Sequence, residues 1–260
     1  MQELTSAGSL DDFLGRLARA PERLLVLDYD GTLAPFTPER DRAVLYAGVA
    51  PLVEAIIASG TVVAFITGRS VATLSPRLPW TDIDIFGAHG CEHRDRQGRH
   101  HRVLLPADAL LALERIEQEM RNRGLGLAME CKYGTIALHW RHAPDTLRTD
   151  IQQALPAILS ALPASVFGAP FDGGFEFRAR AANKGTALKI LLDRHPQAAV
   201  AYLGDDLTDE DAFAALPAHG LGVLVRPALR PTRASVWVRP PAELLDFLSA
   251  WIAKDPARTS

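Results

Sequence analysis

The sequence is poor in cysteine and in long apolar runs. Its two cysteines, Cys91 and Cys131, have no CxxC partner and no histidine at zinc-ligand spacing. They therefore exclude a disulfide framework and a structural zinc site, and we expect a reducing, cytoplasmic environment. No stretch approaches the roughly 18 consecutive apolar residues of a membrane-spanning helix. The chain starts without the basic segment and apolar run of a signal peptide, so no membrane association is expected.

Lysine is scarce, although basic residues as a group are not. Lys and Arg together number 28, and 4 of them are lysines, which leaves 24 arginines. Any lysine that the chain keeps is therefore a candidate for a specific task. The 31 acidic residues give a formal net charge of −3, which argues against the basic face that nucleic-acid binding requires. Apolar residues make up 48% of the 260 positions, enough for a full core in one large domain or two smaller ones.

Short apolar runs alternate with segments of helical periodicity in the first and last thirds of the chain. Buried strands are predicted at 23–27, 61–66, 83–86, 198–203 and 222–225. Helices are predicted at 9–20, 50–59, 184–194, 209–216 and 243–254. This alternation is typical of the α/β class and predicts a Rossmann-like doubly wound parallel sheet with helices on both faces.

The pattern changes in the middle of the chain. Residues 94–102 are rich in Arg and His, helices are predicted at 108–123 and 145–162, and a hairpin is predicted around the turn 132–134. A flexible glycine-containing run at 168–174 precedes a strand at 175–177 that we assign to the returning core. The prediction is therefore a discontinuous core, residues 1–92 and 177–260, with an α+β cap domain, residues 93–176, inserted in it.

The first candidate site is the segment Asp28-Tyr29-Asp30-Gly31-Thr32, directly after a predicted strand. Strand side chains alternate, so Asp28 and Asp30 point to the same side, and Gly31 allows a turn without a Cβ clash. Two carboxylates this close repel each other unless a cation lies between them or one is protonated. An ordinary acidic turn would also contain an Asp-Gly pair. The position at a strand end favours a catalytic role, because open parallel sheets bind ligands beyond the carboxyl ends of their strands.

The second candidate site is the acidic segment GDDLTDED at 204–211. Capping of the following helix by Thr208 and Asp211 accounts for the second half of this segment. It does not account for Asp205 and Asp206, which end a buried strand. Hard oxygen ligands from two strand ends are what Mg²⁺ requires, so we expect a metal site here.

Three single residues complete the predicted edge of the sheet. Lys184 opens a helix, where the helix dipole disfavours a cation, and this placement suggests a task such as neutralising a phosphoryl group. Thr67 follows a buried strand and could bind a phosphoryl oxygen together with nearby backbone N–H groups. His89 follows the strand predicted at 83–86 and is either a turn residue or a ligand contact.

With these segments in this order, the chain resembles the haloacid dehalogenase-like superfamily of aspartate-based phosphatases. The signatures are DxDGT, a Ser or Thr after the second strand, a Lys at a helix start and an acidic GDD segment. They stand here at 28–32, Thr67, Lys184 and 204–209. The insert resembles the larger, α/β type of cap in that superfamily. The resemblance implies a phosphoric monoester hydrolase with Mg²⁺ as its cofactor.

Shorter matches resemble one family within it, the trehalose-6-phosphate phosphatases. They are GDDLTDE at 204–210, GAHG at 87–90, ECK at 130–132, HWR at 139–141 and NKG at 183–185. The resemblance implies a substrate site formed by Gly68, Arg69, His89, Glu130, Lys132, Glu176 and Asn183. The stretch RARAA at 178–182 departs from the family, which often carries a Pro and a Gly there.

The resemblance also implies hydrolysis of a sugar phosphate through an aspartyl-phosphate. Asp28 would attack phosphorus, and Asp30 would protonate the leaving sugar oxygen and then activate water. Thr67 and Lys184 would stabilise the charge on the phosphoryl oxygens. The cap would select the sugar through hydrogen bonds to its hydroxyl groups.

The implied metal ligands are the carboxylates of Asp28 and Asp205 and the backbone carbonyl of Asp30. Asp206 and Asp209 would orient the waters of the ion. The implied partner is a small-molecule sugar phosphate, with neither nucleic acid nor membrane involved. We expect a monomer that pairs functionally with a trehalose-6-phosphate synthase.

Three alternatives remain open at this stage. A phosphatase for another sugar phosphate, such as sucrose phosphate or mannosyl-3-phosphoglycerate, would carry the same core motifs. A phosphotransferase or mutase would keep the Asp28 chemistry but return the phosphoryl group to a sugar. A non-catalytic sugar-phosphate sensor would have no need to keep both Asp28 and Asp30.

Overall fold

The protein divides into two compact units in a computed structural model that describes residues 1–4, 9–37, 43–141, 144–171 and 173–253. The core unit comprises Met1–His101 and Asn183–Ser260, and the inserted unit comprises Arg102–Ala182. The breaks predicted at 92/93 and 176/177 therefore fall several residues too early. The predicted last helical residue, Lys254, lies outside the described residues.

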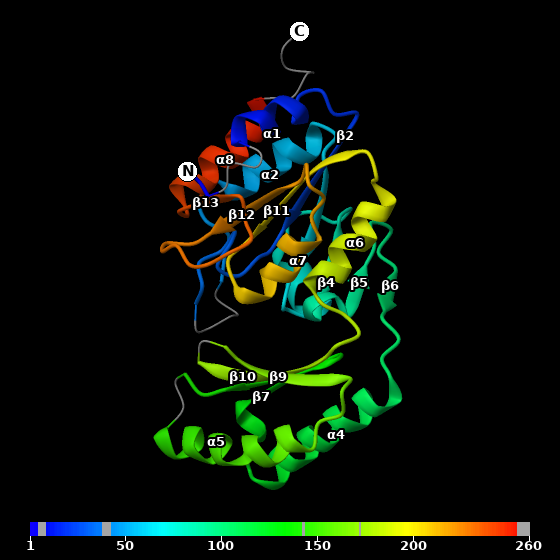
Figure 1. The fold of residues 1–260 in the computed structure, drawn as a ribbon, viewed down its shortest axis with the longest axis vertical. Coiled ribbons are helices and arrows are strands. Elements are labelled where there is room, and N and C mark those ends of the chain that lie inside the picture. Colours follow the sequence, from blue (N-terminus) through cyan, green and yellow to red (C-terminus); the bar gives the residue numbers. More distant parts are fainter. Residues whose placement is uncertain (5–8, 38–42, 142–143, 172, 254–260) are drawn as a thin grey trace. The chain divides into compact units, whose positions relative to one another are not determined.

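The core unit is built on one sheet with the strand order β1-β13-β12-β11-β2-β3-β4-β5-β6 (Figure 1). All neighbours from β13 to β4 are parallel, whereas β1 and β5 pair antiparallel at the two sides. This confirms the predicted doubly wound α/β fold. The strands are β1 (Gln2–Glu3), β2 (Glu22–Leu27), β3 (Val62–Ile66), β4 (Asp84–Gly87), β5 (Glu92–Arg94), β6 (His100–Arg102), β11 (Ala198–Gly204), β12 (Leu221–Val225) and β13 (Val236–Val238).

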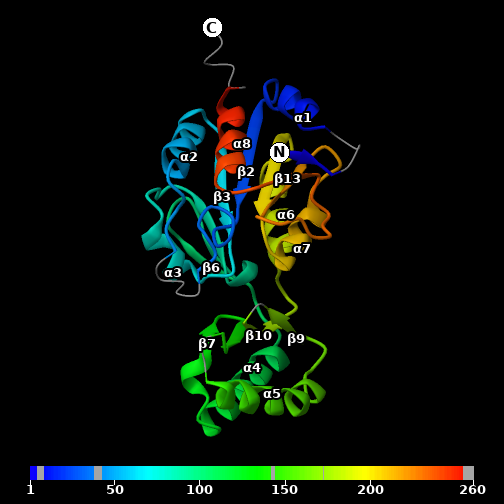
Figure 2. The ribbon, with the colours of Figure 1, turned by 90° about the vertical axis from the view of Figure 1, so that its left-hand side faces the viewer.

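Helices cover both faces of this sheet because the central strands are apolar on both sides. Leu25 and Leu27 of β2 pack toward α1, α2 and α8, and Leu24 and Val26 pack toward α6 and α7 (Figures 1 and 2). Continuous apolar strands of this kind are typical of parallel sheets with two covered faces. The helices are α1 (Leu10–Leu17), α2 (Val49–Ala58), α3 (Val71–Leu74), α6 (Lys184–Arg194), α7 (Glu210–Ala215) and α8 (Ala242–Ala253).

Residues 92–94 and 100–102 form β5 and β6 of the core sheet, although no apolar residues predict strands there. Polar pairs hold this region instead. The ring of His93 stacks on Phe86 with 4.0 Å between centroids, and its Nε2 lies 2.5 Å from the Asp84 carboxylate. Because these contacts are invisible in the hydropathy pattern, the first domain break was predicted too early.

The inserted unit is a four-stranded antiparallel sheet, in the order β7-β8-β10-β9, with two helices. Figure 1 shows both helices along one face of this sheet. Its elements are α4 (Ala107–Asn122), β7 (Met129–Lys132), β8 (Thr135–His139), α5 (Asp145–Ser160), β9 (Val166–Phe171) and β10 (Gly174–Ala179).

Two predictions for this unit are wrong. Residues 168–171 of the run predicted as flexible belong to β9, and the strand predicted at 175–177 for the core lies within β10 of the inserted sheet. Gly168 explains the first error, because a Cβ at this position would lie 2.6 Å from Cε1 of Phe175. The glycine permits close packing within a strand rather than marking a loop.

The helices found in the described ranges also bear on membrane association. None of them is both long enough and apolar enough to cross a bilayer.

Candidate active site

The carboxyl ends of three adjacent strands place the predicted catalytic residues together. The N–H of Asp28 donates to the carbonyl of Leu203 on β11, and the N–H of Thr67 donates to Phe86 on β4, both at 2.9 Å. These bonds extend the ladders of β2 and β3 by one residue beyond the strands. Asp28 and Thr67, which are 4% and 1% exposed, therefore lie at the same edge as Asp205, which follows β11.

The loop after β2 is folded tightly around its own backbone. The carbonyl of Tyr29 accepts the N–H groups of Thr32, Leu33 and Ala34 at 3.0–3.3 Å. Gly31 has a φ of +80°, and a Cβ at this position would lie 2.1 Å from Oδ2 of Asp205. Glycine is therefore required twice here, for the backbone conformation and for the approach of the Asp205 carboxylate.

Lys184, the first residue of α6, forms ion pairs with two buried carboxylates. Its Nζ lies 3.1 Å from Oδ1 of Asp28 and 2.7 Å from Oδ1 of Asp209. Burial disfavours the charged ammonium group, but the attraction of Asp209 and Asp28 outweighs it and raises the pKa of Lys184. The lysine that the sequence singles out is therefore a fixed positive charge beside Asp28.

Asp209 uses both carboxylate oxygens within the protein. Oδ1 accepts from Lys184 and from the hydroxyl of Tyr202, and Oδ2 accepts from the backbone N–H groups of Asp205 and Asp206 at 3.1 and 2.9 Å. The side chain is fully buried. Asp209 therefore positions Lys184 and the acidic loop, and its predicted role in orienting the waters of a metal stays a prediction. The Asp206 carboxylate accepts from the N–H of Leu207 as a helix cap.

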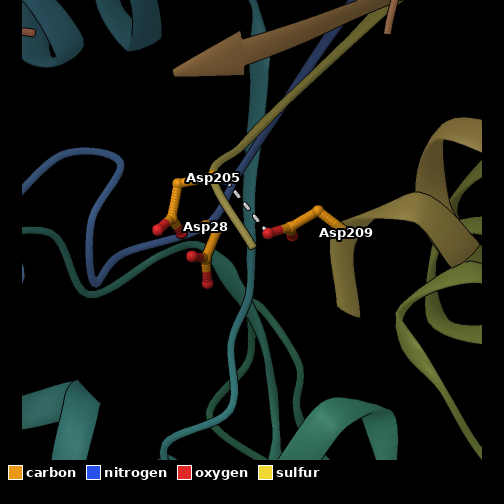
Figure 3. Close-up of side chains that lie close together, drawn as sticks. All are labelled: Asp28, Asp205 and Asp209. Carbon is orange, nitrogen blue, oxygen red and sulfur yellow. Dashed lines mark hydrogen bonds between the residues drawn. The ribbon is translucent and has the colours of Figure 1, made fainter. Parts of the chain in front are cut away.

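The carboxylates of Asp28, Asp205 and Asp209 offer oxygens that all lie within 4.8 Å of one another (Figure 3). Burial raises the pKa of Asp28 to about 7, opposed by Lys184 and increased by Asp209 and Asp30. Burial, followed by the charges of Asp28 and Asp209, raises the pKa of Asp205 well above its ordinary value. Burial is thus the main cause of both raised pKa values, and repulsion between the carboxylates adds to it.

The donor set at this edge fits a divalent cation. Oδ1 of Asp205 is buried and has no hydrogen-bond partner among the residues that the structure describes. An orphaned carboxylate oxygen beside a second carboxylate is costly unless a cation binds there. Since Asp209 is fully engaged, the carboxylates left for the ion are those of Asp28 and Asp205.

Asp30 is held by an arginine that was assigned to the substrate. Nε and Nη2 of Arg69 each lie 2.6 Å from a carboxylate oxygen of Asp30, in a bidentate pair. The Arg69 guanidinium is buried and lies over the ring of Tyr29, 5.3 Å from its centroid. The geometry therefore gives Arg69 a role in orienting Asp30; contact with a substrate stays a prediction.

His89 is buried against Gly68 in an unusual backbone conformation. Its φ is +56° and that of Ala88 is +48°, in the left-handed region that non-glycine residues rarely adopt. A Cβ on Gly68 would lie 2.8 Å from Cε1 of the His89 ring. Such strain costs on the order of 1–3 kcal/mol and concentrates at functional sites. It favours a specific role for the His89 ring at this edge of the sheet.

Asn183 caps the helix that Lys184 begins. Its side-chain oxygen accepts the N–H of Thr186 at 2.8 Å, and the Thr186 hydroxyl accepts the N–H of Asn183 in return. The observed role of Asn183 is therefore to fix the start of α6, and its predicted contact with a substrate remains a prediction.

The three cap residues predicted to bind sugar lie together in the inserted unit. Nζ of Lys132 lies 3.5 Å from Glu130 and 3.8 Å from Glu176, which come from β7 and β10. Their strands flank β8, so one face of the sheet carries all three groups. His139, which we did not assign to this site, hydrogen-bonds Glu130 at 3.1 Å.

Other contributors at the core edge were not predicted from the sequence. Tyr202 lies within an apolar strand and has the pattern of a core residue, yet its hydroxyl donates to Asp209. Arg226 and Arg230, which follow β12, donate hydrogen bonds to backbone carbonyl groups of the acidic loop after β11. The chain has 24 arginines, and nothing in the sequence distinguishes these two from the others.

Comparison with solved structures identifies the fold. The C-terminal domain of the C. albicans trehalose-6-phosphate phosphatase superposes with a TM-score of 0.78 at 21% identity, over 97% of this chain and 99% of that one. A phosphatase of the haloalkanoate (HAD) enzyme superfamily, BT1666 from Bacteroides thetaiotaomicron, gives 0.62 at 16% identity over 88% and 95%. The fold is therefore that of the HAD-like phosphatases.

The sequence comparisons identify the family. A family model described as trehalose-phosphatase matches residues 26–236. The trehalose-phosphate phosphatase of Mycobacterium marinum is 30% identical over 257 residues, which cover 92% of this chain and 65% of that protein. The corresponding protein of Mycobacterium tuberculosis is 29% identical over 90% and 61%. The chain belongs to the trehalose-phosphatase family and spans somewhat under two thirds of the length of these relatives.

The raised pKa of Asp28 predicts how stability depends on pH in metal-free protein. The unfolded carboxyl titrates near its ordinary 3.8 and the folded one near 7, so the folded state binds more protons between these values. Stability contributed by this group is therefore lost as the pH rises from about 4 to about 7. We expect Asp28→Asn to flatten this decline by about 1 kcal/mol or more, measured by urea unfolding in a chelator.

The control is Asp193→Asn, which removes one charge from an exposed position on α6. It should leave the decline unchanged. Parallel pH profiles for Asp28→Asn and the unsubstituted protein would show that burial does not raise the pKa of Asp28.

Proposed function

We propose that this protein is a Mg²⁺-dependent phosphatase that hydrolyses trehalose 6-phosphate to trehalose and phosphate through an aspartyl-phosphate. Membership of the trehalose-phosphatase family supports the substrate class. The single observation that carries the mechanism is the buried Asp28 carboxylate, 3.1 Å from the fixed charge of Lys184 and beside the orphaned oxygen of Asp205. A candidate nucleophile, a positive charge and a carboxylate oxygen available to a metal therefore lie together at one edge of the sheet.

In the first step, a carboxylate oxygen of Asp28 attacks phosphorus while the bond to the sugar oxygen breaks. Asp30 gives its proton to that departing oxygen. In the second step, Asp30 takes a proton from water, the water oxygen attacks phosphorus, and the bond to Asp28 breaks. Lys184 and Thr67 donate hydrogen bonds to the phosphoryl oxygens as charge moves onto them.

Arg69 supports the second role of Asp30, as a base, by holding its carboxylate. The bidentate pair fixes the rotamer of Asp30 without removing it from solvent, since this side chain is 21% exposed. The guanidinium favours the ionised form, which is the form that takes a proton from the incoming water, and the pair must open for Asp30 to carry the proton that it donates in the first step.

The metal would be held by the carboxylates of Asp28 and Asp205 and by the backbone carbonyl of Asp30. When bound, Mg²⁺ supplies positive charge that offsets the repulsion between the Asp28 carboxylate and the phosphoryl group. Asp28 and Asp205 bind it as ionised carboxylates, so their raised pKa values predict weaker binding at acidic pH.

The inserted unit would act as the cap that selects the sugar. Glu130, Lys132 and Glu176 offer charged donors and acceptors to hydroxyl groups, and His139 orients Glu130. A polar site of this kind discriminates strongly against a ligand that leaves its groups unpaired. His89 and Gly68 would contribute from the core unit, as the resemblance implies.

The remaining parts of the proposal concern the cellular setting. With two cysteines, one buried and one exposed, the chain suits a reducing cytoplasm. We propose that it acts as a monomer on a soluble sugar phosphate supplied by a trehalose-6-phosphate synthase.

The test is phosphate release from a panel of disaccharide and monosaccharide phosphates, with and without Mg²⁺. We expect trehalose 6-phosphate to be the best substrate and a chelator to abolish turnover. Asp28→Asn should lower turnover by on the order of a thousandfold or more, because the nucleophile is lost while the residues that surround it remain.

Each rival predicts a different result in this panel. Preference for sucrose phosphate or mannosyl-3-phosphoglycerate would replace the proposed substrate but keep the chemistry. Transfer of the phosphoryl group to a sugar, without incorporation of solvent oxygen into phosphate, would indicate a phosphotransferase. No turnover of any member, with retained binding, would indicate a sensor.

A second prediction isolates recognition of the sugar. Lys132→Ala should lower kcat/KM for trehalose 6-phosphate by about 10- to 100-fold, because a charged hydrogen-bond donor is lost. Hydrolysis of a small aryl phosphate, which has no sugar to bind, should change by less than about threefold. The matched control is Lys189→Ala, at an exposed position on α6. An equal loss on both substrates would contradict a sugar-binding role for Lys132.

A further inference from the structure

The acidic loop after β11 is gripped by two arginines that the chemistry described so far does not use. Nη1 of Arg226 donates to the carbonyl of Asp205 at 3.1 Å. Nη2 of Arg230 donates to the carbonyl of Asp206 at 2.7 Å, and its Nε and Nη2 both lie 3.4 Å from the carbonyl of Asp205. Two cations thus converge on two adjacent peptide groups. We call Arg226 and Arg230 the arginine clamp.

The clamp is itself anchored by neighbouring elements. Arg226 directly follows β12; its N–H donates to Val238 on β13, and its carbonyl accepts from Nε1 of Trp237. Arg230 is paired with Glu210 of α7, and both side chains are mostly buried, at 14% and 21% exposure. The two guanidinium groups are therefore held in place from outside the loop that they contact.

The loop is held from the opposite side by Asp209. Its carboxylate accepts the N–H groups of Asp205 and Asp206, while the clamp donates to their carbonyl groups. With the peptides before and after it fixed, Asp205 keeps only side-chain rotations. Gly31 leaves room for the carboxylate in its observed direction, because a Cβ there would lie 2.1 Å from Oδ2 of Asp205. The backbone from which this carboxylate extends is therefore held on both sides.

Stability alone does not account for the clamp. Nε of Arg226 is buried and has no hydrogen-bond partner in the described part of the chain, and such a donor costs on the order of 1–3 kcal/mol. Oδ1 of the carboxylate that the clamp positions is likewise buried without a hydrogen-bond partner in the described part of the chain. In a turn selected only for stability, we would expect every buried donor to have a hydrogen-bond partner and no unpaired carboxylate oxygen to be buried.

We propose that Arg226 and Arg230 are positioning residues that hold the Asp205 carboxylate in the direction required to bind a divalent cation, an inference that rests on the metal site of the proposed function. Neither arginine touches the ion. They act through the backbone of Asp205, and their own charge works against cation binding. Positioning and electrostatics therefore predict effects of opposite sign when one arginine is neutralised.

The test is the dissociation constant of Mg²⁺, measured by titration calorimetry on the full chain without substrate. Arg230→Gln should raise this constant on the order of tenfold, as loss of a supporting hydrogen bond does at other metal sites. Arg230→Lys keeps the charge but loses the planar fork, so it should also bind more weakly. Arg226→Gln should change binding in the same direction.

The matched control is Arg233→Gln, three residues after Arg230. Arg233 contacts Glu210 through its backbone N–H, which the substitution keeps. The substitution removes the same charge from the same region and should leave Mg²⁺ binding unchanged or slightly tighter. If the Arg230→Gln variant binds Mg²⁺ as tightly as the Arg233→Gln variant does, the proposed role of the clamp is wrong. Thermal unfolding in a chelator confirms that each variant is folded, and the affinity of the folded protein is the readout that a purely structural role would not move.

Failure of the proposed function gives a different pattern. If the unsubstituted protein shows no Mg²⁺ binding that Asp205→Asn abolishes, the metal site itself is wrong, and the role of the clamp falls with it. If that binding is present but indifferent to Arg230, the metal site stands and only the clamp is wrong.

Discussion

The repulsion among buried carboxylates at one edge of the parallel sheet is the constraint on which the rest of the site depends. Asp28, Asp205 and Asp209 lie within a few ångströms of one another, and a single lysine lies among them. Asp209 is neutralised internally by Lys184, Tyr202 and two backbone N–H groups. Lys184 also pairs with Asp28, so one ammonium group faces three carboxylates, and this excess of negative charge defines a place for a cation.

The surrounding structure serves to keep these charges together. Gly31 admits the Asp205 carboxylate, Asn183 fixes the helix that presents Lys184, and the arginine clamp holds the acidic loop from behind. The apolar clusters on both faces of the sheet stabilise the fold and offset the unfavourable free energy of burying these charges. A strained, charged edge on a well-packed scaffold is the usual arrangement of an active site in this class of fold.

The sequence predicted the core strands, and the grouping of Asp28, Lys184 and Asp205 at their carboxyl ends, because these follow local rules. Strand ends, Gly31 and the helix start at Lys184 are visible as short patterns, and α6 was predicted with its observed bounds. The errors arose where tertiary contacts override local pattern. Gly168 lies within a strand because a phenylalanine ring takes the space of its side chain, and the Asp84–His93 pair stabilises a strand region without apolar residues. The roles of Arg69 and Arg230 depend on partners distant in sequence.

The most direct measurement of the central claim is the pre-steady-state time course of Asp30→Asn with an aryl phosphate. The phenolate of an aryl phosphate leaves without help from an acid, so Asp28 should still be phosphorylated in this variant. Hydrolysis of the aspartyl-phosphate should be slow, because Asp30 is no longer there to act as the base. We predict a burst of phenol close to one equivalent per enzyme, followed by slow turnover, and no burst when Asp28 is also replaced by Asn. A linear time course at the wild-type rate would contradict covalent catalysis by Asp28 with Asp30 as the base.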